Sequence, residues 1–269
     1  MKEPVAAIEQ NKLTVAKANE FILRARYDLS TLQLKIVLYI IAQIQKYDVD
    51  LPLITFSIQD FCRVCGIDEN SGGNYRLIKD AVKQITDKSH WITLEDGRET
   101  VIRWIEKPYM DKYNGTITVK LDNDLKPFLM DLTGNFTLYE IWNIMRLKSK
   151  YAIRFYEFIK CKHFDEDAPY QFRQDLEELK AIVGAESYKT FSAFRERVLE
   201  PAIAEINTKT DKIVSYDALA TGRKTNTLII YVKTKSQLDI DTIHAEIDEF
   251  FNPIPTIESE VKKLDRIGW

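Results

Sequence analysis

The chain has 269 residues, of which 45% are apolar and 29% charged, and it contains only three cysteines. These values are typical of a globular protein with a substantial core, and the length favours two domains. The low cysteine count excludes a disulfide scaffold, and no uninterrupted apolar run of about 18 residues predicts a membrane span. We therefore expect no membrane partner and, since no apolar signal segment opens the chain, a cytoplasmic location.

The formal net charge of −3 hides an uneven distribution of charge along the chain. Residues 146–235 hold 17 Lys and Arg against 13 Asp and Glu, a net of +4. Residues 236–269 hold 3 against 8, a net of −5, which leaves −2 for the rest. The basic segment keeps nucleic acid open as a partner, although the charge of the whole chain disfavours it.

The first half of the chain predicts helices followed by strands. Met1–Val15 is polar and predicts a mobile arm. Ser30 or Asp28 can cap a strongly apolar helix that runs to about Lys46 and must lie in a core. Alternating β-branched and aromatic residues from Trp91 to Leu121 predict strands. Two further helices are expected between these regions, at Ile58–Gly66 and Tyr75–Asp87.

The second half repeats this order of elements. Apolar periodicity predicts a helical piece at Phe136–Met145, and β-like runs flank Gly222-Arg223-Lys224. The acidic segment Leu238–Phe251 is amphipathic. Three further helices, the second of them short, are expected between the first piece and the hairpin, at Tyr151–Cys161, Leu176–Gly184 and Ser187–Asn207.

The helix at Ser187–Asn207 has one apolar face and one polar face. Its apolar residues recur every three or four positions, which is typical of a buried helix face in any protein. Arg195 falls among these apolar positions, so it must snorkel, pair internally or lie on a helix of different phase. Pro201 should confine DNA contacts to the stretch before it. The buried face is Phe191, Phe194, Val198, Ala202 and Ile206, and the opposite face is Lys189, Thr190, Ala193 and Arg197.

An internal repeat relates the two halves. Leu34–Ile41 resembles Tyr151–Ile159 at an offset of 117, and Asp60–Asp68 matches Glu178–Glu186 at an offset of 118. The helix from Tyr75 then corresponds to the helix from Tyr188, and strands follow each. Helix, turn, helix and hairpin in that order are the arrangement of a winged helix. We therefore predict an α+β fold of two tandem winged-helix domains, at 16–134 and 135–235, between an arm at 1–15 and an acidic tail at 236–269.

Three motifs in the second half carry a resemblance to a known family. They are LKSKYAIRFYEFIK (Leu147–Lys160), FRERVLEPAIAEINTKTD (Phe194–Asp211) and GRKTNTLIIYVK (Gly222–Lys233). Together they resemble the signature of the RepB-type plasmid replication initiators, the iteron-binding Rep proteins. Asn19–Ser30 with its following apolar helix resembles the start of that family. The resemblance covers roughly residues 15–235 and does not include the tail.

The resemblance implies two winged helices with different roles. The C-terminal one would read repeated origin sites in double-stranded DNA, and the N-terminal one would mediate dimerisation and contact the adjacent backbone. Family members bind iterons as monomers, melt the origin, recruit host helicase and initiator proteins, and often repress their own gene as dimers. No cofactor is implied.

The DNA-binding residues that we expect belong to four groups. The helix described above supplies base readers, because Arg and Lys read guanine edges in the major groove. The hairpin tip, a helix start and a first-half helix supply phosphate contacts, although each could equally be an ordinary charged surface or, for Arg195, a structural arginine. The groups are Lys189, Thr190, Ala193, Arg195 and Arg197; Arg223 and Lys224; Lys148, Ser149, Lys150 and Arg154; and Arg76, Lys79 and Lys83.

Other functions receive weaker support from the sequence. Cys62 and Cys65 form a CxxC that Cys161-Lys162-His163 could complete as a zinc site, but the repeat aligns Cys65 with the apolar Val183. No phosphate-binding GxxxxGK[ST] loop and no His-x-His occur, so we expect neither a metal site nor catalysis. Gln237–Ile240 faintly resembles a sliding-clamp peptide but lacks its apolar ending. A winged-helix transcriptional repressor without an initiation role is the alternative function.

Overall fold

The computed structural model describes residues 13–45, 48–68, 71–94, 96–130, 132–163, 168–222 and 224–251. The chain forms two compact units, Met1–Lys235 and Ser236–Trp269. The predicted arm lies outside the described residues as far as position 12. The prediction of a mobile arm is wrong for its last two residues, Thr14 and Val15, because they belong to the first strand. None of the helices within the described ranges is long and apolar enough to cross a bilayer.

The first half of the larger unit alternates helices with short strands. A 3-10 turn at Asn123–Leu125 precedes its last helix. The elements are β1 (Thr14–Ala18), α2 (Asn19–Arg24), β2 (Ala25–Arg26), α3 (Thr31–Ile41), β3 (Ile54–Ser57), α4 (Ile58–Val64), α5 (Asn74–Thr86), β4 (Ser89–Thr93), β5 (Glu99–Arg103), β6 (Tyr109–Asp111), β7 (Thr116–Val119) and α6 (Lys126–Leu129).

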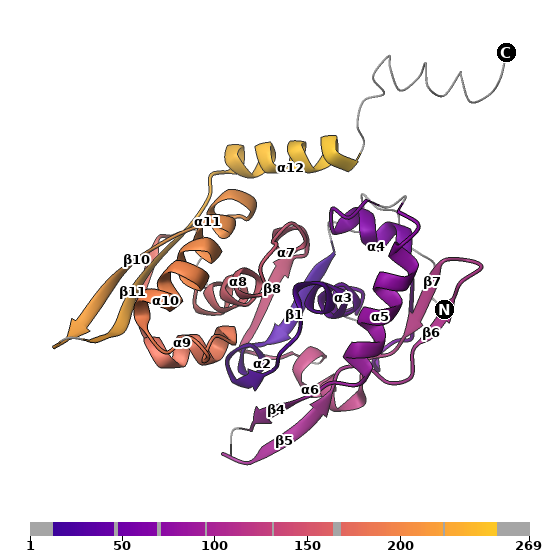
Figure 1. The fold of residues 1–269 in the computed structure, drawn as a ribbon, viewed down its shortest axis with the longest axis horizontal. Coiled ribbons are helices and arrows are strands. Elements are labelled where there is room, and N and C mark those ends of the chain that lie inside the picture. Colours follow the sequence, from indigo (N-terminus) through magenta and orange to yellow (C-terminus); the bar gives the residue numbers. More distant parts are fainter. Residues whose placement is uncertain are drawn as a thin grey trace. The chain divides into compact units, whose positions relative to one another are not determined.

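The second half contains longer helices and a long hairpin. The elements are β8 (Phe136–Glu140), α7 (Trp142–Met145), α8 (Lys150–Lys162), β9 (Tyr170–Asp175), α9 (Leu176–Val183), α10 (Phe191–Phe194), a π-helical turn (Arg195–Leu199), α11 (Glu200–Lys209), β10 (Lys212–Thr221) and β11 (Lys224–Thr234). Figure 1 shows β10 and β11 as a hairpin beside α10 and α11. The smaller unit contains α12 (Gln237–Phe251), as its amphipathic pattern predicts.

The same winged-helix arrangement occurs in both halves, which confirms the predicted repeat. β3 lies between α3 and α4 and pairs with β7, in the sheet order β3-β7-β6. β9 lies between α8 and α9 and pairs with β11, in the order β10-β11-β9. The wing of the first half is therefore β6–β7. The hairpin β4–β5, which follows α5 directly, is an insertion that pairs with β2.

An antiparallel pair of strands, β1 and β8, connects the two halves. Thr14 pairs with Glu140 and Ala18 with Phe136. The prediction of a helix from Phe136 is wrong for β8, because burial there alternates with period two: Thr137 and Tyr139 are buried, and their neighbours are exposed. Only Trp142–Met145 is helical.

Side-chain caps explain where the central helices begin. Ser30 and Gln33 form a capping box at the start of α3, and Ser149 accepts a hydrogen bond from the Tyr151 amide at the start of α8. Helix α3 ends at Ile41, earlier than the predicted Lys46. Both helices are buried along most of their length, so each is the centre of its half's core.

The core of the first half contains an aromatic cluster with an uncharged histidine. His90 is buried and stacks on Trp104 with ring centroids 4.4 Å apart, and Phe21 and Tyr27 contact it edge-on. Neither ring nitrogen has a hydrogen-bond partner within the described part of the chain. Burial, followed by the nearby charges of Arg154 and Lys17, lowers the pKa of His90 to about 4.

We predict that this histidine destabilises the fold in acid. Between the His90 pKa of about 4 in the folded chain and the ordinary histidine pKa of 6.5, only the unfolded state is protonated. Stability is therefore complete above pH 6.5 and decreases as the pH falls towards 4. The loss should reach about 2–3 kcal/mol. Urea unfolding at several pH values measures it. His90→Phe, which keeps the aromatic stack, should remove this part of the pH dependence; an unchanged slope would contradict the assignment.

Candidate nucleic-acid interface

The helix expected to read DNA begins later than its apolar pattern indicates. Thr190 is the N-cap, and its hydroxyl accepts a hydrogen bond from the Ala193 amide at 3.2 Å. The predicted start at Ser187 is therefore four residues too early. Lys189 precedes the helix, and its ammonium donates to the carbonyl of Glu186 at 3.1 Å. Both Lys189 and Thr190 are exposed, as a role in DNA binding requires.

A π-helical turn at Arg195–Leu199 interrupts this helix before Pro201. Proline has no N–H to donate to the preceding turn, so a wider turn there accommodates the missing hydrogen bond. The turn shifts the phase of the helix. Phe191 is only half-buried, and Leu199 joins the buried face. The fully buried residues are Phe194, Val198, Leu199, Ala202 and Ile206.

The shifted phase places both arginines of the turn on the surface. Arg195 does not lie among the core residues: its side chain is 49% exposed and pairs with Glu200 at 3.6 Å. Glu200 also accepts a hydrogen bond from the Tyr216 hydroxyl at 3.4 Å. Arg197 is exposed, and none of the described residues gives it a hydrogen bond or an ion pair. Arg197 is therefore free for an external partner, and Arg195 must leave Glu200 to reach one.

The wing and the start of the helix supply further positions. Gly222 adopts φ 65°, the left-handed conformation that this tight hairpin turn requires. Arg223 lies outside the described residues, and Lys224 begins β11. Ser192 is exposed in the first helical turn, and its hydroxyl could contact a phosphate or a base edge. The sequence prediction missed Ser192 because an ideal wheel places it at the edge between the buried face and the opposite face.

The residues at the start of α8 that were expected to bind phosphate already form hydrogen bonds and an ion pair within the protein. Lys148 is exposed, but its amide donates to Glu205 at 2.6 Å. The Lys150 ammonium lies 2.6 Å from a carboxylate oxygen of Asp28 and holds the pKa of that carboxyl below its ordinary value. Ser149 is occupied by capping α8. A phosphate bound at this helix start would therefore compete with internal contacts.

Arg154 corrects the sequence prediction. It is 5% exposed and lies 4.0 Å above the centre of the Tyr27 ring. Its guanidinium donates to the backbone carbonyls of Ala25 at 3.1 Å and of Tyr27 at 3.4 Å. A side chain so enclosed contacts the first half of the protein and not DNA.

The first half presents a separate basic surface on α5. Arg76, Lys79 and Lys83 are all exposed, and their spacing places them along the outer side of the helix. No ion pair engages any of the three within the described part of the chain. Helix α5 occupies the position in the first half that α10 and α11 occupy in the second, so the two surfaces are equivalent in the repeat.

The cysteines lie in the core. Cys62, Cys65 and Cys161 are buried and form no disulfide, and burial raises the pKa of the Cys65 thiol to about 12. The position of Cys65 agrees with its alignment to Val183 in the repeat. In the described ranges, no group of three His, Cys, Asp or Glu residues is arranged to hold a metal ion.

Two winged helices in one compact unit, each with an exposed basic helix, define a tandem winged-helix protein. The model of the family described as "Initiator Replication protein, WH1" matches residues 14–160, and that of "Initiator Rep protein, WH2" matches residues 175–232. The chain belongs to this family of replication initiators. The WH1 match includes β8 and most of α8, whereas the predicted first domain ends at residue 134.

A solved structure shares the fold. The Pi initiator protein, determined in complex with iteron DNA, matches with a TM-score of 0.69 and 20% sequence identity. The match covers 84% of this chain and 99% of the Pi chain. The part of this chain that matches therefore has the architecture of the whole Pi chain.

We predict that Arg197→Ala weakens binding to the cognate site and relaxes base preference. Loss of a bidentate base contact should cost about 1–3 kcal/mol on that site and much less on a duplex with the contacted pair changed. Titrating both duplexes measures this difference. Arg98→Ala is the control, because it removes the same charge from an exposed turn where Arg98 pairs with Asp96 at 2.7 Å. Unchanged affinity and preference in Arg197→Ala would contradict the assignment.

The basic surface on α5 should act differently. Lys79→Ala combined with Lys83→Ala is expected to weaken binding to all sequences alike, because phosphate contacts carry no sequence information. The slope of log affinity against log salt should become shallower by about 2, or about one for each lost contact. A slope equal to that of the wild type would exclude these lysines from the interface.

Proposed function

We propose that this protein is a plasmid replication initiator that binds repeated origin sites, or iterons, in double-stranded DNA without catalysing a reaction. The observation that carries the proposal is the pair of winged helices in one unit, with Arg197 unpaired on one and Arg76, Lys79 and Lys83 exposed on the other. Such a chain can contact one duplex at two places.

The family and the similar structure support this proposal. Both family models describe initiator replication proteins, and the Pi chain was determined on iteron DNA. In this proposal the second winged helix reads bases through Lys189, Arg195 and Arg197, and its wing contacts phosphate through Arg223 and Lys224. The first winged helix contacts the neighbouring backbone through α5. Specificity then arises mainly from the second half and non-specific affinity from both.

The later steps of initiation also belong to the proposal and rest on the family resemblance. They are opening of the origin, recruitment of host helicase and initiator proteins, and repression of the protein's own gene by a homodimer formed through the N-terminal domain. A protein that acts on plasmid DNA does so in the cytoplasm. The 236–269 tail has no assigned role.

The alternative is a winged-helix repressor that takes no part in initiation. Footprinting on the DNA that flanks the encoding gene distinguishes the two functions. We expect several protected direct repeats next to an AT-rich tract, because an initiator must load many copies beside DNA that opens. A single protected inverted repeat over a promoter would instead favour the repressor. Metal-dependent nicking of supercoiled DNA by purified protein would contradict the non-catalytic part of the proposal.

A further inference from the structure

The contacts between the two winged helices are buried and directional. The ammonium of Lys17, in β1, lies 2.5 Å from a carboxylate oxygen of Glu157, in α8. The same oxygen accepts a hydrogen bond of 2.6 Å from the Tyr139 hydroxyl, in β8. The side chains of Lys17 and Glu157 are only 1% and 2% exposed. A buried charge pair of this kind tolerates little displacement, because separation leaves each charge without solvent or partner.

Further polar contacts join the same two halves around α8. Arg154 packs on Tyr27 and donates to backbone carbonyls of the first half, as described above. The buried ammonium of Lys35, in α3, donates to the carbonyl of Met145 at the end of α7. The Thr31 hydroxyl donates to the carbonyl of Lys148 at 3.2 Å. These contacts act at separate places, so together they restrain rotation as well as separation.

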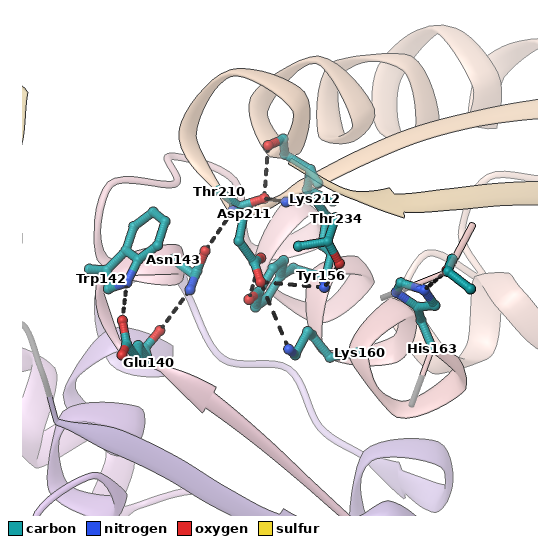
Figure 2. Close-up of polar contacts among 12 residues, drawn as sticks. Glu140, Trp142, Asn143, Tyr156, Lys160, His163, Thr210, Asp211, Lys212 and Thr234 are labelled. Atoms are coloured by element: carbon teal, nitrogen blue, oxygen red, sulfur yellow. Dashed lines mark hydrogen bonds and ion pairs between the residues drawn. The ribbon is translucent and has the colours of Figure 1, made fainter. Parts of the chain in front are cut away.

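A second network extends from the connecting segment to the DNA-reading helix and the wing (Figure 2). Asn143, in α7, accepts a hydrogen bond of 2.8 Å from the amide of Asp211, in the turn between α11 and β10. The Asp211 carboxylate accepts one of 2.9 Å from the Tyr156 hydroxyl and lies 3.4 Å from the Lys212 ammonium. Lys212 in turn donates to Thr234, at the end of β11. The end of the reading helix and both ends of the wing are thereby tied to the segment that follows β8.

We propose that Lys17, Glu157 and Asn143 are positioning residues that fix the distance and rotation between the two DNA-contacting helices. The protein then accepts only DNA sites whose two contacted regions have one spacing. This inference rests on the proposed function, because it requires both winged helices to contact one duplex. It adds that the spacing is set by the protein's buried polar contacts and not by the DNA alone.

Because of the geometry of DNA, changing the spacing between the two contacted regions is a sensitive test of how rigidly the two halves are held. One added base pair moves the second region by about 3.4 Å and rotates it by about 35° around the duplex. A rigid protein cannot follow both changes, so one helix loses its contacts. If the two halves can move relative to each other, both helices can still reach their contacts on the altered DNA. Binding then costs the conformational entropy that the halves lose when they become fixed.

The test compares spacing preference in the wild type and in two variants. Lys17→Met with Glu157→Gln removes both buried charges while keeping side-chain volume and an acceptor for Tyr139, so neither charge is left uncompensated in the core. Asn143→Ala removes the separate contact with Asp211. The DNA probes are the footprinted site with one base pair added or removed between the regions that the two halves protect.

For the wild type, we expect the altered spacing to lower affinity by about tenfold or more, because at least one bidentate contact is lost. In both variants the same change should cost less than about threefold, with most affinity for the original site retained. Equal spacing penalties in the wild type and both variants would overturn the inference. So would a wild type that tolerates altered spacing.

A measurement without DNA keeps the two proposals distinguishable. Spin labels on Gln59→Cys, in α4, and Ala204→Cys, in α11, report the distance between the halves, since both positions are exposed and the native cysteines are buried. The distance distribution should be narrow in the labelled wild type and broader in each variant. Unchanged widths in folded variants would overturn the positioning role. Failure of the wild type to bind any repeated site would instead contradict the proposed function.

Discussion

A buried ion pair imposes the constraint on which the arrangement of the two halves depends. Glu157 lies in the middle of α8 and has almost no access to water, so its charge must be balanced within the protein. Lys17 balances it, and Tyr139 hydrogen-bonds it; burial and the carboxylate together raise the pKa of that tyrosine well above its ordinary range. Removal of one charge alone would leave the other uncompensated, at a cost of about 3–5 kcal/mol. The pair therefore requires β1, β8 and α8 to stay together.

Helix α8 is accordingly both a core helix and a connector. Three of its side chains point to three different parts of the molecule: Glu157 contacts β1, Arg154 contacts Tyr27, and Tyr156 contacts the turn before the wing. Its apolar residues fill the core of the second half, beneath α9 and α11. This arrangement explains why a helix with so many polar side chains is buried along nearly its whole length. Its polar groups are satisfied by partners from both halves of the repeat, and these contacts also hold the halves in place.

Long helices and the repeat were predictable, whereas short strands and buried charges were not. The apolar periodicity of α8 and α9 identified these helices at nearly their observed limits, and that of α3 identified its start but placed its end about five residues too late. Two nearly equal offsets identified the duplication. β1, β3 and β9 were missed although they are similar in length to the predicted β4, β5 and β7, because each runs directly into a helix and so lacks at its end the turn residues that bound a recognisable strand. Arg154 resembled a surface residue because its partners are a ring and two backbone carbonyls far away in the chain, and composition does not reveal such partners.

The helix expected to read DNA shows how one residue limits a prediction of which side chains are buried and which are exposed. Pro201 removes one backbone donor, and the chain responds with the wider turn at Arg195–Leu199. A wheel drawn with the period of an α-helix aligns residues on either side of that turn incorrectly, which is why Arg195 fell among the apolar positions of the wheel. Two of the alternatives left open for it hold, since it pairs with Glu200 and the helix has a different phase. The wider turn instead exposes both Arg195 and Arg197 while Val198 and Leu199 remain in the core. The proline that was expected to end the DNA-facing stretch thus also determines which side chains that stretch presents.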